Sequence, residues 1–242
     1  MARKKTPAVD DAYNLILNKI LSFELLPGEI VSDFQLSQQL NMSRTPIREA
    51  IMRLTMMGLI EQGESRMLVS RITPKDIKEI CEVREAIETK AVILILKNGG
   101  LTPTQLTNLY SLNREMQEYV SLNNYPSNFD CDHRLHNNLV TYSGNSRLVE
   151  FSDRMWLQFK RVRWLTILRP RYNYSIAEHQ ELIDAISERN LSRAINAVTE
   201  HLVNAADNFE AVLNDQTLGI LAKRIADATS SLTTHAHSSK IP

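Results

Sequence analysis

Glycine, proline and cysteine are all scarce in this sequence, which contains seven Gly, eight Pro and two Cys among 242 residues. Because glycine and proline interrupt regular helices, and most of them fall at the ends of apolar-periodic segments, their scarcity predicts a mainly helical chain. Cys81 and Cys131 show neither Cys-x-x-Cys spacing nor a disulfide framework. The sequence therefore excludes a small disulfide-stapled fold and suits a reducing compartment.

Long apolar runs and an excess of charge of either sign are also missing. The 28 Lys and Arg residues balance 28 Asp and Glu residues, so a nucleic-acid partner would have to be met by a local basic patch. No stretch approaches the roughly eighteen apolar residues of a membrane-spanning helix, and the charged N-terminus lacks the apolar segment of a signal peptide. We expect a soluble, cytoplasmic protein without a membrane partner, large enough for two packed domains.

The first part of the chain carries signals for three helices and a hairpin. Capping residues and apolar periodicity predict helices over residues 9–22, 32–40 and 43–57, and Gly58 ends the third. The strings "LIEQ" and "RMLVSRI" follow as two short strands. This order predicts a winged helix-turn-helix domain over residues 1–72.

The third of these helices carries two arginines where a groove-reading helix needs them. Ser43 is a natural N-cap, and Arg44 and Arg48 share one helical face, opposite the apolar Ile47 and Ile51. The major groove of B-DNA accepts one α-helix, whose N-terminal residues reach base edges. The same two arginines also fit an ordinary solvated face, and their charge alone does not separate the two interpretations.

Further helical segments follow, and they predict an all-helical bundle over residues 73–228. The chain from residue 229 to residue 242 is rich in Ser and Thr and is predicted to be disordered. The predicted helices of the bundle cover residues 75–97, 103–123, 128–142, 146–168, 176–188, 192–213 and 215–228.

Four polar side chains lie on core-facing positions of these helices. Asp132 and His136 share one face of the same predicted helix, and His179 and His201 lie in apolar stripes of two others. The last two are equally far from Asn190 in an expected helical hairpin, so they come level. A single inward histidine is more often a hydrogen-bonded core residue, but a buried carboxylate is costly unless it is paired or bound to a metal. The set predicts a divalent metal site, and its imidazole and carboxylate ligands suit Zn²⁺ or Ni²⁺.

Two more polar residues are candidates for contact with a small ligand beside this site. Arg84 lies in an apolar stripe with Glu88 one turn later. It either forms a buried ion pair with Glu88 or binds the carboxylate of an effector through two N–H groups. Asn145 either orients a ligand or caps the next helix. His133 lies off the face of the cluster and is predicted to be solvated, and Trp156 belongs to a stretch interpreted as an amphipathic helix rather than a nucleic-acid platform.

The segment "MSRTPIREAIMRLTMMGLIE" strongly resembles the DNA-binding helix of the GntR family of bacterial transcription factors. The string "FELLPGEIVSDFQLSQQL" matches the preceding part of that domain, so the resemblance covers residues 9–72. It implies contacts with DNA from Ser43, Arg44, Thr45 and Arg48.

The resemblance also implies a glycine at the tip of the hairpin that faces the minor groove, with Arg66 as a candidate contact there. The expected register departs from the family pattern, since it places Met67 at the tip and displaces Gly63. Phe34 also stands where family members often have a polar or charged residue.

Residues 74–213 are similar to the helical ligand-binding domain of the FadR subgroup, known as FCD. The Asp-x-x-x-His pattern, the two separated histidines and the string "SGN" match that domain. The similarity implies that Asp132, His136, His179 and His201 hold a divalent metal that helps to bind a small organic acid.

Together these patterns predict a DNA-binding transcription regulator rather than an enzyme. We expect a repressor that binds a palindromic operator on double-stranded DNA as a homodimer, with an affinity that a small carboxylate effector controls. The alternative is a metalloenzyme that uses the Asp/His₃ site, with the N-terminal domain as an accessory. A direct metal-ion sensor is a third interpretation.

Overall fold

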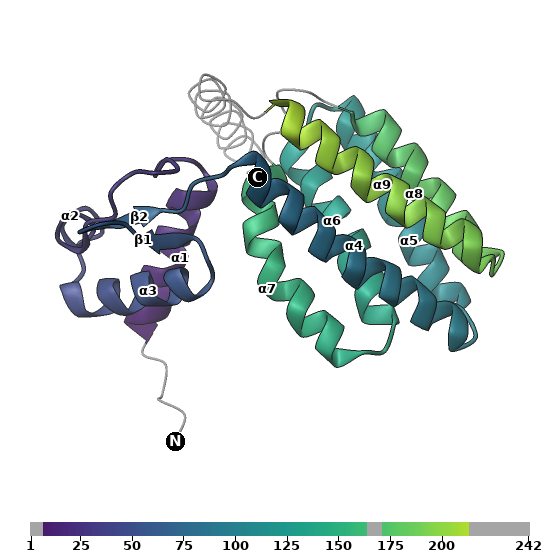
Figure 1. Cartoon of the computed structure of the whole chain (residues 1–242), viewed down its shortest axis with the longest axis horizontal. Helices are drawn as coiled ribbons and strands as arrows, with labels where there is room; N and C mark the ends of the chain where they lie inside the picture. The colour runs from purple at the N-terminus through teal and green to yellow at the C-terminus, as the bar shows by residue number, and fades with distance from the viewer. Residues whose placement is uncertain (1–6, 164–170, 213–242) are drawn as a thin grey trace, which may run out of the picture. The chain divides into compact units, whose positions relative to one another are not determined.

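The computed structural model describes residues 7–163 and 171–212 of the chain (Figure 1). The chain divides between Thr73 and Pro74 into two compact units. The described residues contain nine helices and one two-stranded antiparallel sheet, so the predicted mainly helical class is confirmed. None of the described helices combines the length and apolar character needed to cross a membrane.

The first unit is the predicted winged helix-turn-helix. The turn between its second and third helices is made at Asn41, whose φ of 50° lies in the left-handed region that asparagine tolerates. Gly58, with a φ of 71°, ends the third helix. Its elements are α1 (Pro7–Leu21), α2 (Asp33–Gln39), α3 (Arg44–Met56), β1 (Ile60–Gln62) and β2 (Met67–Val69).

The core of this unit lies between α1 and α3. Ile16 and Ile20 of α1 and Ile47 and Leu54 of α3 are at most 1% exposed. Burial of one apolar stripe fixes the rotation of α3 about its own axis, because turning it would bring polar residues into the core. The opposite face of α3 is therefore held toward solvent.

The hairpin register differs from the prediction. Ile60 pairs with Val69 and Gln62 pairs with Met67, so Met67 begins β2 and does not lie at the tip. The turn instead contains Gly63 and Arg66, and the Gly63 N–H donates to the Arg66 carbonyl at 2.8 Å. Burial of Ile60 and Val69 on one face selects this register, because a slip of one residue would turn one of the two side chains to solvent.

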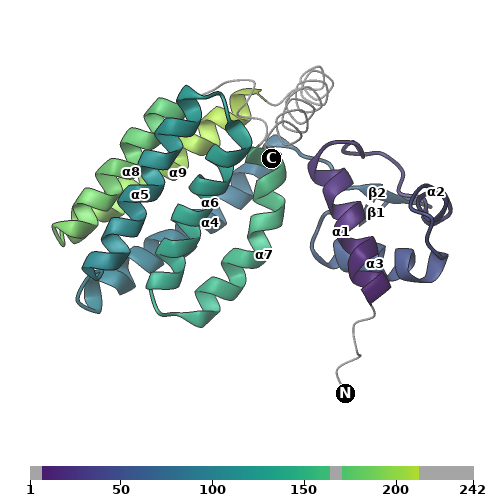
Figure 2. The ribbon, with the colours of Figure 1, turned by 180° about the vertical axis from the view of Figure 1, so that it is seen from behind.

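The second unit is an all-helical bundle. Its helices α8 and α9 pack against each other after a short turn in which Arg189 has a φ of 56°. Helix α4 packs against α9, and α5 packs against both α6 and α8; Figure 2 shows α5 and α8 side by side. The bounds are α4 (Pro74–Lys97), α5 (Pro103–Ser121), α6 (Tyr125–Tyr142), α7 (Ser146–Arg163), α8 (Tyr172–Ser187) and α9 (Leu191–Val212).

Two of these helices, α6 and α8, begin more than one residue earlier than predicted. Helix α6 starts at Tyr125 because Pro126 is accommodated in its first turn and Asn124 caps it, with the Asn124 side-chain oxygen accepting from the Ser127 N–H at 3.3 Å. Helix α8 starts at Tyr172. The helix predicted over 215–228, the tail over 229–242 and the end of the helix predicted over 146–168 lie outside the described residues.

Candidate functional site

The exposed face of α3 presents both predicted arginines. The side chains of Arg44 and Arg48 are 50% and 60% exposed, and both contact the carboxylate of Asp33 at the start of α2. The Nη2 group of Arg44 donates to Asp33 Oδ2 at 2.9 Å, and Arg48 Nε donates to the same oxygen at 2.5 Å. Hydrogen bonds from Arg44 and then Arg48 lower the pKa of Asp33, so this carboxylate is ionised near neutral pH.

The two hydroxyl residues beside these arginines are exposed as well. Ser43 occupies the N-cap position of α3, but its hydroxyl makes no capping hydrogen bond within the described residues. Thr45 lies in the first turn of the helix and is also exposed. Both hydroxyls are therefore available to a partner that approaches the N-terminus of α3.

A hollow of about 660 Å³ lies beside this face of α3. Asp33, Arg48 and Arg66 are among the residues that line it, so α3 and the turn of the hairpin border the same open space. Arg66 itself is exposed. All five residues predicted to contact DNA are thus exposed within one unit, and two of them share this hollow.

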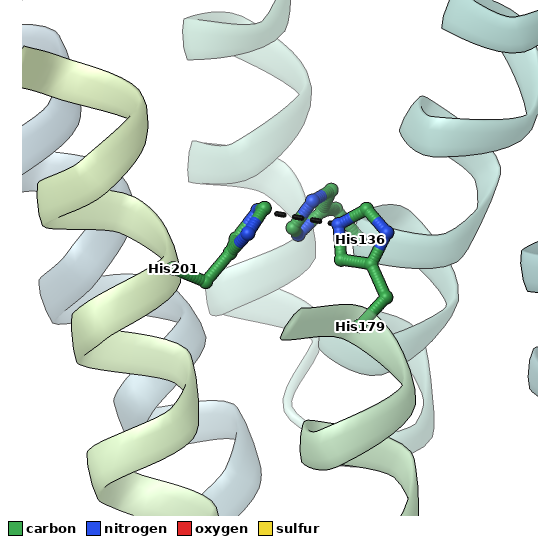
Figure 3. A group of neighbouring side chains, drawn as sticks. All are labelled: His136, His179 and His201. Atoms are coloured by element: carbon green, nitrogen blue, oxygen red, sulfur yellow. Dashed lines mark hydrogen bonds between the residues drawn. The ribbon is translucent and has the colours of Figure 1, made fainter. Parts of the chain in front are cut away.

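The three predicted histidine ligands meet inside the second unit (Figure 3). His136 from α6, His179 from α8 and His201 from α9 are 6%, 0% and 3% exposed. One ring nitrogen from each lies within 4.8 Å of the other two. The sequence-based expectation that His179 and His201 converge is therefore confirmed, and His136 joins them.

Carboxylates hold the outer nitrogens of two of these rings. His136 Nδ1 lies 2.6 Å from Glu88 Oε2, and His201 Nδ1 lies 2.9 Å from Glu178 Oε2. Burial by itself would raise the pKa of Glu88, but the charge of Arg84 and the contact with His136 outweigh it and lower that pKa to about 2. An ionised carboxylate only accepts hydrogen bonds, so the Nδ1 atoms of His136 and His201 carry the protons. In a neutral ring of this tautomer, Nε2 has no proton and its lone pair is free.

Glu178 is held in the same way by its neighbours. Its pKa is lowered to about 2 because hydrogen bonds from His201 and Arg171 outweigh the effect of burial. Arg171 donates through both terminal amino groups to the two carboxylate oxygens, and the Asn204 side-chain amide donates at 2.8 Å. This carboxylate therefore has a fixed orientation toward the His201 ring.

The third ring is arranged differently. His179 Nε2 lies 3.2 Å from His201 Nε2. Because His201 Nε2 carries no proton, it accepts the hydrogen bond and His179 Nε2 donates it. His179 Nδ1 is buried without a hydrogen-bond partner among the described residues, and so is His136 Nε2. Burial first, then the neighbouring His201 and His136, lower the pKa of His179 well below its ordinary value, which keeps the ring neutral.

These nitrogens fit a divalent metal ion. Transfer of the His179 proton from Nε2 to Nδ1 would leave three bare Nε2 atoms facing one another. Two nitrogens each about 2.0–2.1 Å from one ion lie roughly 3 Å apart, close to the observed 3.2 Å between His179 and His201. Three neutral imidazoles are a donor set that suits Zn²⁺, Ni²⁺ and related ions.

Asp132, the fourth predicted ligand, lies beside the cluster but has another partner. It is 3% exposed, and its Oδ1 accepts a hydrogen bond from Arg163 Nη2 at 2.9 Å. The same oxygen is 3.8 Å from His179 Nε2. Burial would raise the pKa of Asp132, but Arg163 outweighs it and holds that pKa well below the usual range. The described conformation thus joins three histidines and pairs the carboxylate with an arginine.

The two candidate effector contacts are also engaged within the protein. Arg84 Nε donates to Glu88 Oε1 at 2.9 Å, and the guanidinium lies 3.9 Å from the centre of the Phe159 ring. This is the buried ion pair that the sequence left as one of two alternatives. The Asn145 side-chain oxygen accepts from the backbone N–H groups of Arg147 and Leu148, so it caps α7.

A cavity of about 20 Å³ adjoins Arg84 and His136, which is room for about one water molecule. His133 and Trp156 also line it, and their rings stack with centroids 3.4 Å apart. The prediction that His133 is solvated is therefore wrong, because α7 packs over it. Burial lowers its pKa to about 4.

Comparisons with known proteins assign both units. The model of bacterial regulatory proteins of the gntR family matches residues 8–65, and the FCD domain model matches residues 79–204. An uncharacterised HTH-type transcriptional regulator in an unstable DNA locus of Streptomyces ambofaciens is 26% identical over 208 residues, which cover 84% of this chain and 85% of the relative. The HTH-type transcriptional repressor RspR of Escherichia coli K12 is 21% identical over 209 residues, which cover 85% and 90%.

Solved structures show the same fold. A putative GntR transcriptional regulator from Rhodococcus sp. RHA1 superposes with a TM-score of 0.68 at 18% identity, over 86% of this chain and all of that one. Escherichia coli McbR/YncC gives a TM-score of 0.66 at 19% identity, over 91% and 99%.

Proposed function

Because the chain belongs to the GntR family of bacterial regulatory proteins and carries an FCD domain, we propose that this transcriptional regulator is a metal-dependent repressor. A small organic acid bound at the metal site sets its affinity for an operator in the cytoplasm. The main support for a metal and effector site is the group of three buried imidazoles, two of which have a carboxylate at Nδ1.

The first unit binds DNA through α3 and the wing. Arg44 and Arg48 reach guanine edges in the major groove, and the exposed hydroxyls of Ser43 and Thr45 contact bases or phosphates at the helix N-terminus. Arg66 contacts the adjacent minor groove from the hairpin tip. A homodimer brings two such units to the halves of a palindrome, because a twofold protein matches a twofold site.

The second unit holds the metal. His136, His179 and His201 would hold the ion through their Nε2 atoms, and Asp132, which is paired with Arg163 in this structure, would be the fourth ligand. Glu88 and Glu178 keep two of the rings in the ligating tautomer, as outer carboxylates do in other histidine metal sites. Zn²⁺ or Ni²⁺, when bound, supplies a positive charge that attracts a carboxylate.

The effector enters where α4, α6 and α7 meet. The present cavity is too small for an organic acid, so binding requires Trp156 to move away from His133. Arg84 then offers its guanidinium to the acid, and Asn145 acts through the start of α7, which it caps. If the acid binds more tightly when Trp156 has moved away from His133, it shifts the population toward that arrangement of α7, and control of DNA affinity requires such a shift.

Regulation is favoured over catalysis by the comparisons. The two relatives compared in sequence are named as transcriptional regulators, and the chain covers at least 85% of the length of each. A direct metal-ion sensor differs from the proposed regulator in one expectation. Its affinity for DNA would change with the concentration of free metal ion even when no organic acid is present.

The test of the DNA-binding part starts with selection of duplexes from a random library by the purified protein. Recovery of a short palindrome by the wild type and its loss in Arg48→Ala are expected. Arg53→Ala is the matched control, since Arg53 lies on the same helix but pairs with Asp10 of α1. Failure of the wild type to enrich any sequence would refute the proposal.

The sensing part is tested on the selected duplex. A panel of small carboxylates is titrated into the protein–DNA complex, once with Zn²⁺ or Ni²⁺ and once after chelation. An acid that releases DNA only from the metal-loaded protein supports the proposal. Release by metal alone would establish the ion-sensor interpretation, and turnover of an acid would establish the enzyme.

A further inference from the structure

One acidic residue lies within the surface that is proposed to read DNA. Asp33 is the first residue of α2, and its carboxylate receives hydrogen bonds from both Arg44 and Arg48. Its side chain is 22% exposed, while the two arginine side chains are 50% and 60% exposed. A negative charge in this position opposes the approach of DNA phosphates, so affinity alone does not explain it.

The contacts leave the outer edge of the Arg48 guanidinium available and the Nη1 group of Arg44. Asp33 binds Arg48 through Nε only, so both terminal amino groups of Arg48 keep their N–H donors. Asp33 accepts from Arg44 Nε and, with both of its oxygens, from Arg44 Nη2, so only the Nη1 group of Arg44 keeps both of its N–H donors. Recognition of the O6 and N7 atoms of guanine takes two neighbouring N–H donors, which the free edge of Arg48 supplies, while Arg44 offers its Nη1 group.

A shared carboxylate also restrains two side chains that would otherwise repel each other and sample many rotamers. An unrestrained arginine pairs with phosphates at any sequence, because phosphates occur at every step. An arginine that is held in one orientation makes both hydrogen bonds only where a guanine lies opposite its free N–H groups.

We infer that Asp33 is a specificity-determining residue that holds Arg44 and Arg48 in a base-reading orientation and weakens their binding to non-operator DNA. The inference rests on the proposed DNA contacts of these arginines. Asp33 acts through the arginines and does not itself touch a base.

The structure offers a matched control in the same unit. Asp10 of α1 pairs with Arg53 of α3, at 2.6 Å between Oδ1 and Nη1, and Arg53 also lies over the Tyr13 ring. Asp10→Asn and Asp33→Asn therefore each remove one negative charge and one carboxylate partner of an α3 arginine. Only Asp33→Asn releases the two arginines on the exposed reading face.

The experiment measures dissociation constants for two duplexes of equal length at one salt concentration. One is the palindrome selected from a random library by the wild type, and the other has random sequence. Both Asn variants are expected to bind the random duplex more tightly. The ratio of the two constants should fall about tenfold in Asp33→Asn, comparable with the discrimination of one bidentate arginine–guanine pair, and stay unchanged in Asp10→Asn.

Asp33→Glu keeps the carboxylate and should recover part of the ratio, which a general effect on folding would not produce. Selection repeated with Asp33→Asn should lose preference at the guanine positions first. An unchanged ratio in Asp33→Asn, or an equal fall in Asp10→Asn, would overturn the inference and leave the proposed function standing. A wild type that selects no palindrome would overturn both.

Discussion

Each unit of the protein places carboxylates against cationic or imidazole groups, but one cluster is exposed and the other is buried. In the first unit the Arg44 and Arg48 side chains that contact Asp33 are half exposed or more. In the second unit the side chains of Glu88 and Asp132 are each 4% exposed. Exposed pairs are screened by salt and rearrange easily, whereas a buried charge needs its partner continuously.

This contrast matches the partner proposed for each unit. A DNA duplex is large and must be met by groups already on the surface. A metal ion is small and gains most from ligands that are fixed and desolvated. Substitutions in the exposed and the buried clusters should therefore differ in the size and the kind of effect that they produce.

The largest effect is expected from Arg84→Met. This change leaves the buried Glu88 carboxylate without its arginine, and removal of one partner of a buried pair costs about 3–5 kcal/mol. Urea unfolding of the metal-free protein measures the loss. Arg193→Met, which breaks pairs with Glu181 and Glu188 near the surface, is the control and should change the midpoint far less. Equal losses in the two variants would contradict the contrast.

Metal addition should stabilise the second unit. At a free Zn²⁺ concentration about 100 times the dissociation constant, binding adds about 2.7 kcal/mol to the free energy of unfolding. Thermal unfolding with and without a chelator measures this gain. His179→Ala should abolish the gain, while Arg48→Ala, in the first unit, should keep it. A full response to metal in His179→Ala would exclude the three-histidine site.

Glu178→Gln should weaken metal binding by about 10- to 100-fold, because a neutral amide no longer fixes which nitrogen of His201 carries the proton. Competition with a chromophoric chelator gives the affinity. Glu181→Gln is the matched control, since Glu181 lies on the same helix but pairs with Arg193 away from the cluster. Equal affinity in both variants would show that the outer carboxylate has no part in binding.

The smallest effect on stability is expected from Ser43→Ala. Ser32→Ala removes a hydroxyl whose oxygen accepts from the Gln35 N–H, and this should cost about 1 kcal/mol. The Ser43 hydroxyl makes no such bond in the described residues, so its loss should leave the urea midpoint unchanged while weakening binding to the selected duplex. A destabilisation as large as that of Ser32→Ala would show that Ser43 acts as a cap.

The sequence was a good guide wherever one helix decides the outcome. The apolar stripes predicted that Arg44 and Arg48 face outward and that His179 and His201 face inward, because the period of 3.6 residues fixes the faces of a helix. It was a poor guide to partners on other helices. Nothing local marks Glu178 as the carboxylate that contacts His201, since the two residues meet only when α8 and α9 pack.

The errors have the same origin. His133 is solvated on an isolated α6 but lies under Trp156 once α7 packs over it. Met67 fits the hairpin tip by sequence spacing, yet burial of the strands selects another register. Asp132 is inward as predicted, but only the position of α7 brings Arg163 to it.

The sequence by itself thus determined the two-part helical organisation, the outward face of α3 that carries Arg44 and Arg48, and the set of inward polar residues, because caps, breakers and periodicity act over a few residues. The tertiary structure decided which polar atoms meet. A hydrogen bond needs its atoms placed to within a few tenths of an ångström, and that placement depends on how whole helices rotate and slide against one another.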